Sequence, residues 1–256
     1  MLVDVTPLTV GNVWLLLRKF RYDSLIDAAV HGYHGIIKTD DLMKPNVVYI
    51  NVGDTVYLAG DETHEAAKEV LELLQDGTEL ICSSAWIELI KRSLNINISE
   101  RTRCVFDHKA LKLETMELMI ASLEDGYYLE SIDESTYYEL LRLPWASSFV
   151  SNFKDYSQFA TLGKGFVVRH DDEIVSGASS YIHYNEGKEV EICTHKDYRR
   201  KGLAKACGAA FIKACILDNE IPHWDAANTA SQHLAETLGY RSKDTYTVYD
   251  LGFDQS

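Results

Sequence analysis

The segment from Val190 to Ala204 combines residue types that bind phosphate groups. Strand-forming residues at 190–194 are followed by a short basic turn, and the pattern Arg199-x-x-Gly202-x-Ala204 then opens a helix. The first N–H groups of a helix have no partner inside it and carry a partial positive charge, and glycine lets the backbone come close to an anion. The segment therefore predicts that an anion such as a pyrophosphate binds at this turn.

The elements that position the turn form a β-α-β unit. We expect strands at 189–194 and 222–226, joined by a helix at 203–217 whose apolar residues recur at helical spacing. Parallel strands joined in this way need a right-handed crossover. Glycine at 239 is well placed to end a further helix at 229–238. The other expected elements are helices at 10–20, 25–30, 62–74, 86–94 and 134–143, strands at 79–82, 103–106, 127–132 and 245–251, and hairpins at 46–59 and 165–181.

These segments resemble the GNAT N-acetyltransferase superfamily in their order and spacing. The resemblance rests on Val190–Thr194, Arg199–Ala204, Trp224–Asn228 and Leu234–Tyr240, and covers about residues 127–251. It implies an α/β (α+β) fold with a mixed, mostly antiparallel sheet flanked by helices. The pattern around Trp224 and Asn228 also looks like a bacterial branch with a divergent N-terminal half.

A domain boundary is expected near Asp125 and Gly126. Residues 1–125 then form an α+β domain of unknown role, and residues 126–256 form the domain with the resemblance. The hairpins at 47–59 and 167–178 have similar outlines. This similarity leaves open that the first half is a degenerate copy of the second.

The resemblance implies that acetyl-CoA binds as a co-substrate. The pyrophosphate would rest on the backbone from Arg200 to Lys205, and the pantetheine arm would pair with the strand at 192–194, where two parallel strands splay apart and leave backbone groups for the ligand. Lys201 and Lys205 either reach phosphate or are solvated, and Asn228 either reaches the arm or caps a helix. The implied cofactor residues are Ile192, Cys193, Thr194, Arg199, Arg200, Lys201, Gly202, Leu203, Ala204, Lys205, Asn228 and Ser231.

The implied reaction is direct transfer of an acetyl group to a primary amine of a small molecule or peptide. Glu191 is the first candidate for the base that deprotonates the amine, although a strand carboxylate can also face solvent or form a structural ion pair. His195 and His223 are reserves. Many family members have a tyrosine, which protonates the leaving thiolate, where this chain has Ala235. The alternative is therefore a catalytically weak acyl-CoA sensor or regulatory module.

Composition excludes several other classes of function. The net charge of −14 argues against nucleic acid as a partner. No apolar run reaches the roughly 18 residues of a membrane span, and the start of the chain lacks the basic residues of a secretory signal. We expect a cytoplasmic monomer or homodimer. The cysteines and histidines lack the spacing of a metal site, so no metal is expected.

Overall fold

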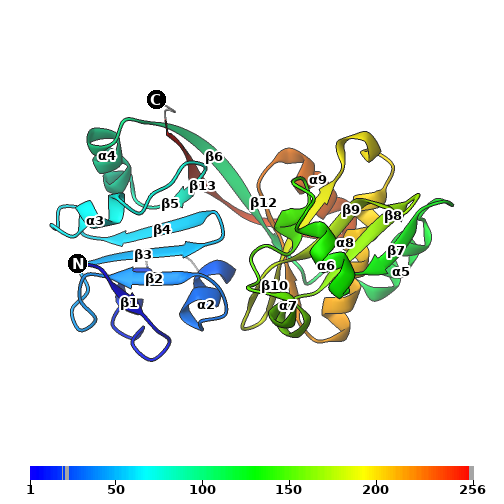
Figure 1. The fold of residues 1–256 in the computed structure, drawn as a ribbon, viewed down its shortest axis with the longest axis horizontal. Coiled ribbons are helices and arrows are strands. Elements are labelled where there is room, and N and C mark those ends of the chain that lie inside the picture. Colours follow the sequence, from blue (N-terminus) through cyan, green and yellow to red (C-terminus); the bar gives the residue numbers. More distant parts are fainter. Residues whose placement is uncertain (19, 21–22, 254–256) are drawn as a thin grey trace. The chain divides into compact units, whose positions relative to one another are not determined.

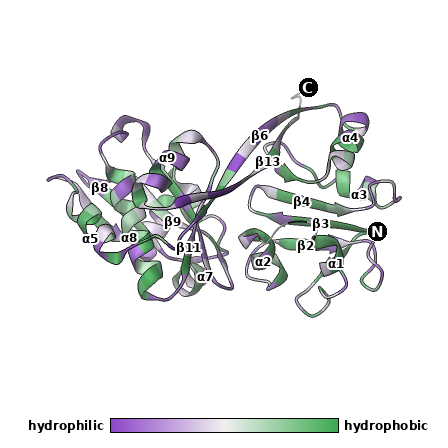
Figure 2. Ribbon diagram, turned by 180° about the vertical axis from the view of Figure 1, so that it is seen from behind, coloured by the Kyte–Doolittle hydropathy of each residue, from purple (hydrophilic) through white to green (hydrophobic). Residues whose placement is uncertain are grey.

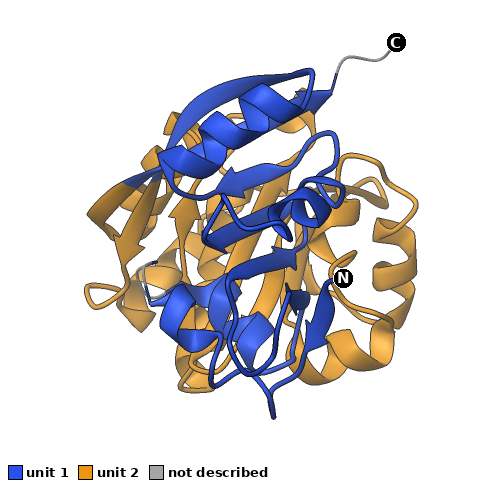
Figure 3. Cartoon of the chain, turned by 90° about the vertical axis from the view of Figure 1, so that its left-hand side faces the viewer, with its two compact units in different colours: residues 1–103, 246–256 blue, residues 104–245 orange. Residues whose placement is uncertain are grey.

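The chain folds into two compact units. The computed structural model describes residues 1–18, 20 and 23–253. Unit 1 comprises residues 1–103 and 246–256, and unit 2 comprises residues 104–245 (Figure 3). This division differs from the expected boundary near Asp125. The reason is helix α5 (Leu113–Ala121), whose Met116 packs in one core with Ala209 and Ile212 of α8 (Leu203–Leu217) and so joins unit 2.

Unit 1 is built on a sheet with the strand order β1-β2-β3-β4-β5-β13 (Figure 1). All neighbouring pairs in it are antiparallel except β4 and β5, which are parallel. The expected hairpin is confirmed as β3 and β4. The strands are β1 (Val3–Val5), β2 (Ile36–Thr39), β3 (Val47–Val52), β4 (Thr55–Gly60), β5 (Glu79–Ile81) and the end of β13 (Arg241–Phe253), and the helices are α1 (Trp14–Leu17), α2 (Ser24–Val30), α3 (Ala67–Leu71) and α4 (Ser84–Ser93).

Two helices of unit 1 are shorter than expected. The helix expected at 62–74 begins only at Ala67, because the Asp61 carboxylate accepts hydrogen bonds from both the backbone and the hydroxyl of Thr63 and holds the preceding residues in a turn. The helix expected at 10–20 is reduced to Trp14–Leu17, and residue 19 of that range lies outside the described residues. At Asp61, local turn chemistry therefore overrides apolar periodicity.

Unit 2 contains the mixed, mostly antiparallel sheet that the resemblance implies. Its strand order is β11-β10-β9-β8-β7, and only the β10–β11 pair is parallel. The strands of this sheet are β7 (Tyr128–Ser131), β8 (Gly165–His170), β9 (Glu173–Tyr184), β10 (Gly187–Thr194) and β11 (Ile221–His223). The short strand β12 (Asp225–Ala226) lies outside this sheet. The remaining helices are α6 (Glu134–Leu140), η1 (Ser147–Phe149), α7 (Tyr156–Leu162), η2 (Lys196–Tyr198) and α9 (Thr229–Leu238).

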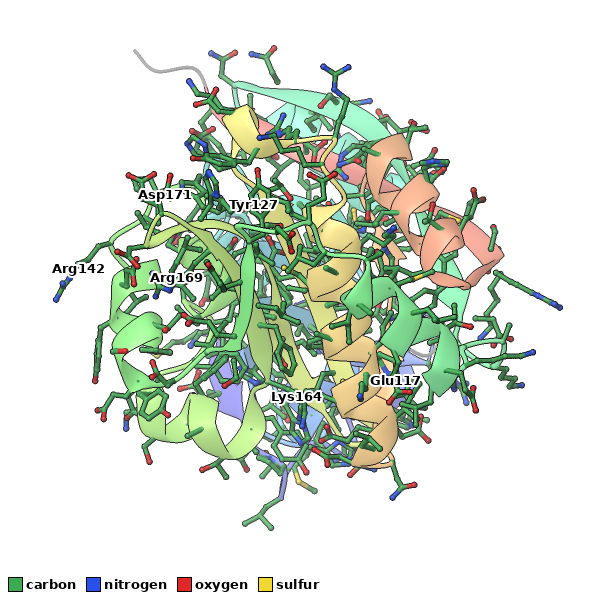
Figure 4. All side chains as sticks on the ribbon, turned by 90° about the vertical axis from the view of Figure 1, so that its right-hand side faces the viewer. Glu117, Tyr127, Arg142, Lys164, Arg169 and Asp171 are labelled. Carbon is green, nitrogen blue, oxygen red and sulfur yellow. The ribbon has the colours of Figure 1, made fainter. Side chains whose placement is uncertain are left out.

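Helices cover both faces of this sheet. On one face, Cys207 and Phe211 of α8 pack against Val175 and Ala178 of β9. On the other face, the core around Phe149 contains residues of α6, η1 and α7. Arg169 of β8 fixes this second layer, because its guanidinium donates to Glu130 of β7 and to Glu139 of α6 (Figure 4). The sheet therefore has one face packed on α8 and one packed on α6, η1 and α7.

Two long strands each contribute to both units. Strand β6 (Ile96–Asp107) begins in unit 1 and ends in unit 2, whereas β13 begins in unit 2 and ends in unit 1. Much of their length is exposed, and both are more hydrophilic than β3 and β4 (Figure 2). The strands expected at 103–106 and 245–251 are thus parts of longer strands.

We expect Gly187→Ala to destabilise unit 2, because β10 and β11 approach closely at this residue. A Cβ atom on Gly187 would lie 2.1 Å from the Ile221 carbonyl oxygen, so the strands must move apart. The free energy of unfolding in urea should fall by about 1–3 kcal/mol. Gly11→Ala is the control, since nothing lies within 4 Å of its Cβ position. Equal stability of the two variants would contradict the close approach.

Candidate functional site

The parallel strands β10 and β11 stay paired over only a short register and then diverge. Pairing runs from Gly187 opposite Ile221 to Glu189 opposite His223. Beyond His223 the chain turns to β6, because the Trp224 carbonyl accepts a hydrogen bond from the Phe106 N–H and β12 pairs with β6. The single strand expected at 222–226 is therefore two short strands, β11 and β12. Strand β11 pairs with one edge of β10 up to Glu189, and from Val190 onward it no longer pairs with that edge.

The residues expected to meet a pantetheine arm lie on this diverging part of β10. Cys193 and Thr194 pair with Gly177 and Ser176 of β9 along their other edge. The Ser176 hydroxyl donates to the Cys193 carbonyl over 3.1 Å and lies 2.7 Å from the Thr194 hydroxyl. Burial raises the pKa of the Cys193 thiol, so the thiol stays protonated and acts in packing.

The basic turn leads directly from β10 into the start of α8. Arg199 donates from Nε to the Thr194 carbonyl over 3.3 Å and so ties the turn to the strand. Arg200 and Gly202 have φ angles of 64° and 76°, which bend the chain sharply before Leu203. No side chain caps the helix at Gly202, and the space around that glycine is open. The first N–H groups of α8 therefore have no capping side chain and lie next to a basic turn.

Lys201 is held by two tyrosines in this structure. Its ammonium group donates to the Tyr127 hydroxyl over 2.9 Å and lies 5.2 Å from the centre of the Tyr198 ring. The hydrogen bond with Tyr127 raises the pKa of Lys201, so the group is charged. Figure 4 shows Tyr127 close to the β8–β9 turn that carries Asp171. Lys205 is half-buried in the first turn of α8.

Asn228 caps a helix, which is one of its two expected roles. The oxygen of its side-chain amide, Oδ1, accepts a hydrogen bond from the Ser231 backbone N–H over 3.0 Å at the start of α9. The Ser231 hydroxyl in turn accepts a hydrogen bond from the Trp224 ring over 3.1 Å. These contacts join α9 to the point where β11 ends. Contact of Asn228 or Ser231 with a cofactor stays a prediction.

Glu191 lies on the face of β10 that packs against η1. Residues two apart in a regular strand share a face, so Glu191 lies on the same side as Cys193, whereas the register of β10 with β9 shifts between Glu189 and Val190. The Ser148 hydroxyl of η1 donates to the Glu191 carboxylate over 3.0 Å. A hydrogen bond from a hydroxyl stabilises the charged form of a carboxylate. Glu191 is therefore a half-buried negative charge beside the diverging strands.

The two reserve histidines occupy opposite ends of β10. His195 follows the strand, 5.4 Å from the Trp145 ring centre, and its Nδ1 lies 3.7 Å from the Asp197 carboxylate. His223 lies in β11 at the last paired position, where its Nδ1 forms a hydrogen bond with the Glu189 carboxylate. Glu189 and Ser148 were not among the expected site residues. In the sequence Glu189 resembles any strand carboxylate, and no motif marks Ser148.

Ala235 lies in the core of unit 2. It packs in one cluster with Trp224, Leu238 and Tyr240, and its side chain is fully buried. The Tyr240 hydroxyl donates to the Pro222 carbonyl over 2.8 Å, and burial raises the pKa of this phenol well above its ordinary value. Tyr240 is thus a packing residue and does not replace the missing tyrosine.

Residues 1–18, 20 and 23–253 contain neither a metal-binding cluster nor a membrane-spanning helix. No group of three or more His, Cys, Asp or Glu side chains is placed to hold a metal ion. In the same part of the chain, no helix combines the length and apolar character needed to cross a bilayer.

Comparisons with known proteins agree with this geometry. A family model described as GNAT acetyltransferase matches residues 15–249. The uncharacterized N-acetyltransferase YdfB of Bacillus subtilis (strain 168) is 26% identical over 250 residues, which are 90% of this chain and 89% of the relative. The structure of a GCN5-related N-acetyltransferase-like protein from Streptococcus suis 89/1591 has a TM-score of 0.86 and 30% identity, covering 96% of this chain and 100% of that one.

A more distant structure has the same fold over both units. It is a tandem GNAT protein from the clavulanic acid biosynthesis pathway, with a TM-score of 0.55 and 11% identity, and the match covers 100% of this chain and 99% of that one. The family model spans most of both units, and the diverging strands and basic turn lie within its match. The chain belongs to the GNAT acetyltransferase family.

Proposed function

We propose that the protein transfers an acetyl group from acetyl-CoA directly to a primary amine of a small molecule or peptide. The observation that supports this most is the continuity of two features: the edge of β10 that loses β11 after Glu189, and the basic turn that follows it at 199–201. One strand thus offers backbone groups to the amides of a pantetheine arm and ends at N–H groups suited to a pyrophosphate.

The acceptor amine approaches from the face of β10 that carries Glu191. Glu191 and Ser148 place a charged carboxylate beside the strand that holds the thioester. A carboxylate attracts the ammonium form of the acceptor, which is the main form of a free amine at neutral pH. The strand N–H groups stabilise the oxyanion, and the enzyme mainly orients the two reactants.

Acyl-CoA binding belongs to unit 2 in this proposal, although unit 1 has related connectivity. The order β3, β4, α3, β5 repeats the order β9, β10, α8, β11, in each case a hairpin followed by a helix and a parallel strand. Where unit 2 has the basic turn, unit 1 has Asp61 and Glu62 before α3. Negative charge there repels a pyrophosphate. These features support the idea that unit 1 is a degenerate copy of unit 2.

The alternative is a sensor that binds acyl-CoA with little turnover. Buried Ala235 favours it, because the usual tyrosine donor to the leaving thiolate is absent. The two functions differ in one measurement, the release of CoA. An enzyme releases CoA in proportion to acetylated amine, whereas a sensor binds acetyl-CoA saturably without release.

We expect CoA release when the protein is given acetyl-CoA and a suitable member of a panel of amino alcohols, polyamines, aminoglycosides and peptides with free N-termini. Glu191→Gln should lower kcat/KM for the amine at least about tenfold while leaving the KM for acetyl-CoA unchanged, because it removes the charge facing the acceptor. Glu236→Gln, which changes an exposed carboxylate of unit 2, is the control. Equal activity of E191Q and wild type would exclude a role for this carboxylate.

Arg199→Ala should weaken binding of CoA about tenfold, since it loosens the turn from Thr194 and removes a positive charge near the pyrophosphate. Isothermal titration calorimetry with CoA measures this. Arg142→Ala is matched in chemistry, and Figure 4 shows Arg142 pointing away from the body of unit 2. Its affinity should equal that of the wild type. If both variants lose affinity equally, the effect comes from net charge and not from the turn.

A further inference from the structure

We propose that His223, held by the buried carboxylate of Glu189, moves the proton during acetyl transfer. In this proposal His223 accepts the proton of the attacking amine and then gives it to the thiolate of CoA. His223 is the catalytic residue and Glu189 positions it. The inference rests on the proposed function, since it assigns the proton chemistry of that same site.

The position of the pair is the first argument. Glu189 and His223 are opposite each other in the last register that joins β10 to β11, so they stand where the strands begin to diverge. Paired residues on neighbouring strands have side chains on the same face of the sheet, and the register of β10 with β9 shifts directly after Glu189. An arm bound along 190–194, with its phosphates at the turn, has its thioester end nearest to this pair.

The burial of Glu189 is the second argument. Its side chain is only 5% exposed, whereas the His223 side chain is 23% exposed. A buried carboxylate is costly unless a cation or a strong donor pairs with it. The hydrogen bond joins Glu189 to Nδ1 of His223. When Nδ1 carries a hydrogen in the neutral ring, Nε2 has the lone pair, so this contact selects Nε2 as the atom that exchanges protons.

The groups around His223 fit a proton carrier. Burial lowers the pKa of His108, and the charges of His223 and Lys243 also lower it, whereas Asp107 acts in the opposite sense. His108 is therefore neutral near pH 7 and does not compete for the proton. The Tyr184 ring packs edge-on to His223 at 6.2 Å. The carboxylate of Glu189 is a charge in direct contact with the imidazole.

Other side chains are less suited to this role. The Tyr240 phenol is buried and bonded to the Pro222 carbonyl, and Ala235 has no proton to give. His195 lies at the far end of β10, beside the turn. Glu191 accepts a hydrogen bond from Ser148 and is the group proposed to bind the ammonium form of the acceptor. An imidazole has intermediate basicity and serves in both directions.

The step starts from the neutral amine, because the bound ammonium group first releases one proton to solvent, and from there it balances without a further reactant. The neutral amine nitrogen attacks the thioester carbonyl and forms a C–N bond, and the nitrogen loses its extra proton to Nε2 of His223. The C–S bond then breaks and its electron pair stays on sulfur. The imidazolium returns the proton to the thiolate, because a thiol is a weaker acid than imidazolium. The products are the amide and CoA as the thiol, and His223 is again neutral.

The test compares His223→Gln, Glu189→Gln and the double variant E189Q/H223Q with wild type, using acetyl-CoA and the best amine of the panel. We expect H223Q to lower kcat about 100-fold or more with an unchanged KM for acetyl-CoA, and to abolish the acid limb of the kcat/KM profile. E189Q should move that limb to lower pH, because it removes the charge that favours imidazolium. The double variant E189Q/H223Q has two neutral amide side chains in place of the charged pair. If it folds but has no activity, the loss of activity comes from the missing imidazole and not from unfolding.

Two controls keep the outcome decisive. Glu236→Gln changes an exposed carboxylate of α9, and it should leave the profile unchanged. Added imidazole should restore part of the activity of His223→Ala, which a structural role does not predict. If wild type acetylates the amine but H223Q keeps its kcat and its acid limb, the inference is wrong and the proposed function stands. If wild type fails to bind acetyl-CoA or to release CoA with any amine, both are wrong.

Discussion

The separation of β10 from β11 is the constraint on which the rest of unit 2 depends. The two strands pair over a short register, and the close approach at Gly187 holds them together there. Immediately afterwards β12 pairs with β6, which draws the chain away from β10. A strand in the middle of a sheet normally has both edges bonded to neighbours. Here one strand begins as an ordinary central strand and continues past the end of its pairing with β11.

Charge is distributed unequally along this strand. Glu189 and Glu191 stand at its start, and the basic turn of Arg199, Arg200 and Lys201 follows its end. In a chain with a net charge of −14, this turn is a local concentration of positive charge. In the proposed function the anionic cofactor lies at the basic end of the strand and the cationic acceptor lies near the carboxylates.

The sequence predicted unit 2 better than unit 1. Helices 203–217 and 229–238 were predicted with their observed bounds, because apolar periodicity, Gly202 and Gly239 mark them clearly. Unit 1 lacks such signals, and the Asp61 turn shortens its third helix. The pairing of Glu189 with His223 was not predicted, because it depends on the register of two strands joined by a helix. The break at Trp224 likewise depends on β6, a strand from far earlier in the chain.

The passage of β13 back into unit 1 has a consequence for biosynthesis. Its residues Tyr249 and Asp250 pair with Leu80 and Glu79 of β5, and Leu251 completes the core of unit 1. A ribosome makes the N-terminal residues of unit 1 first, but the last strand of that unit emerges only after all of unit 2. Contacts so distant in sequence form slowly. Unit 1 therefore stays without its final strand until the residues after 245 have been made, and its edge at β5 is exposed to mispairing until then.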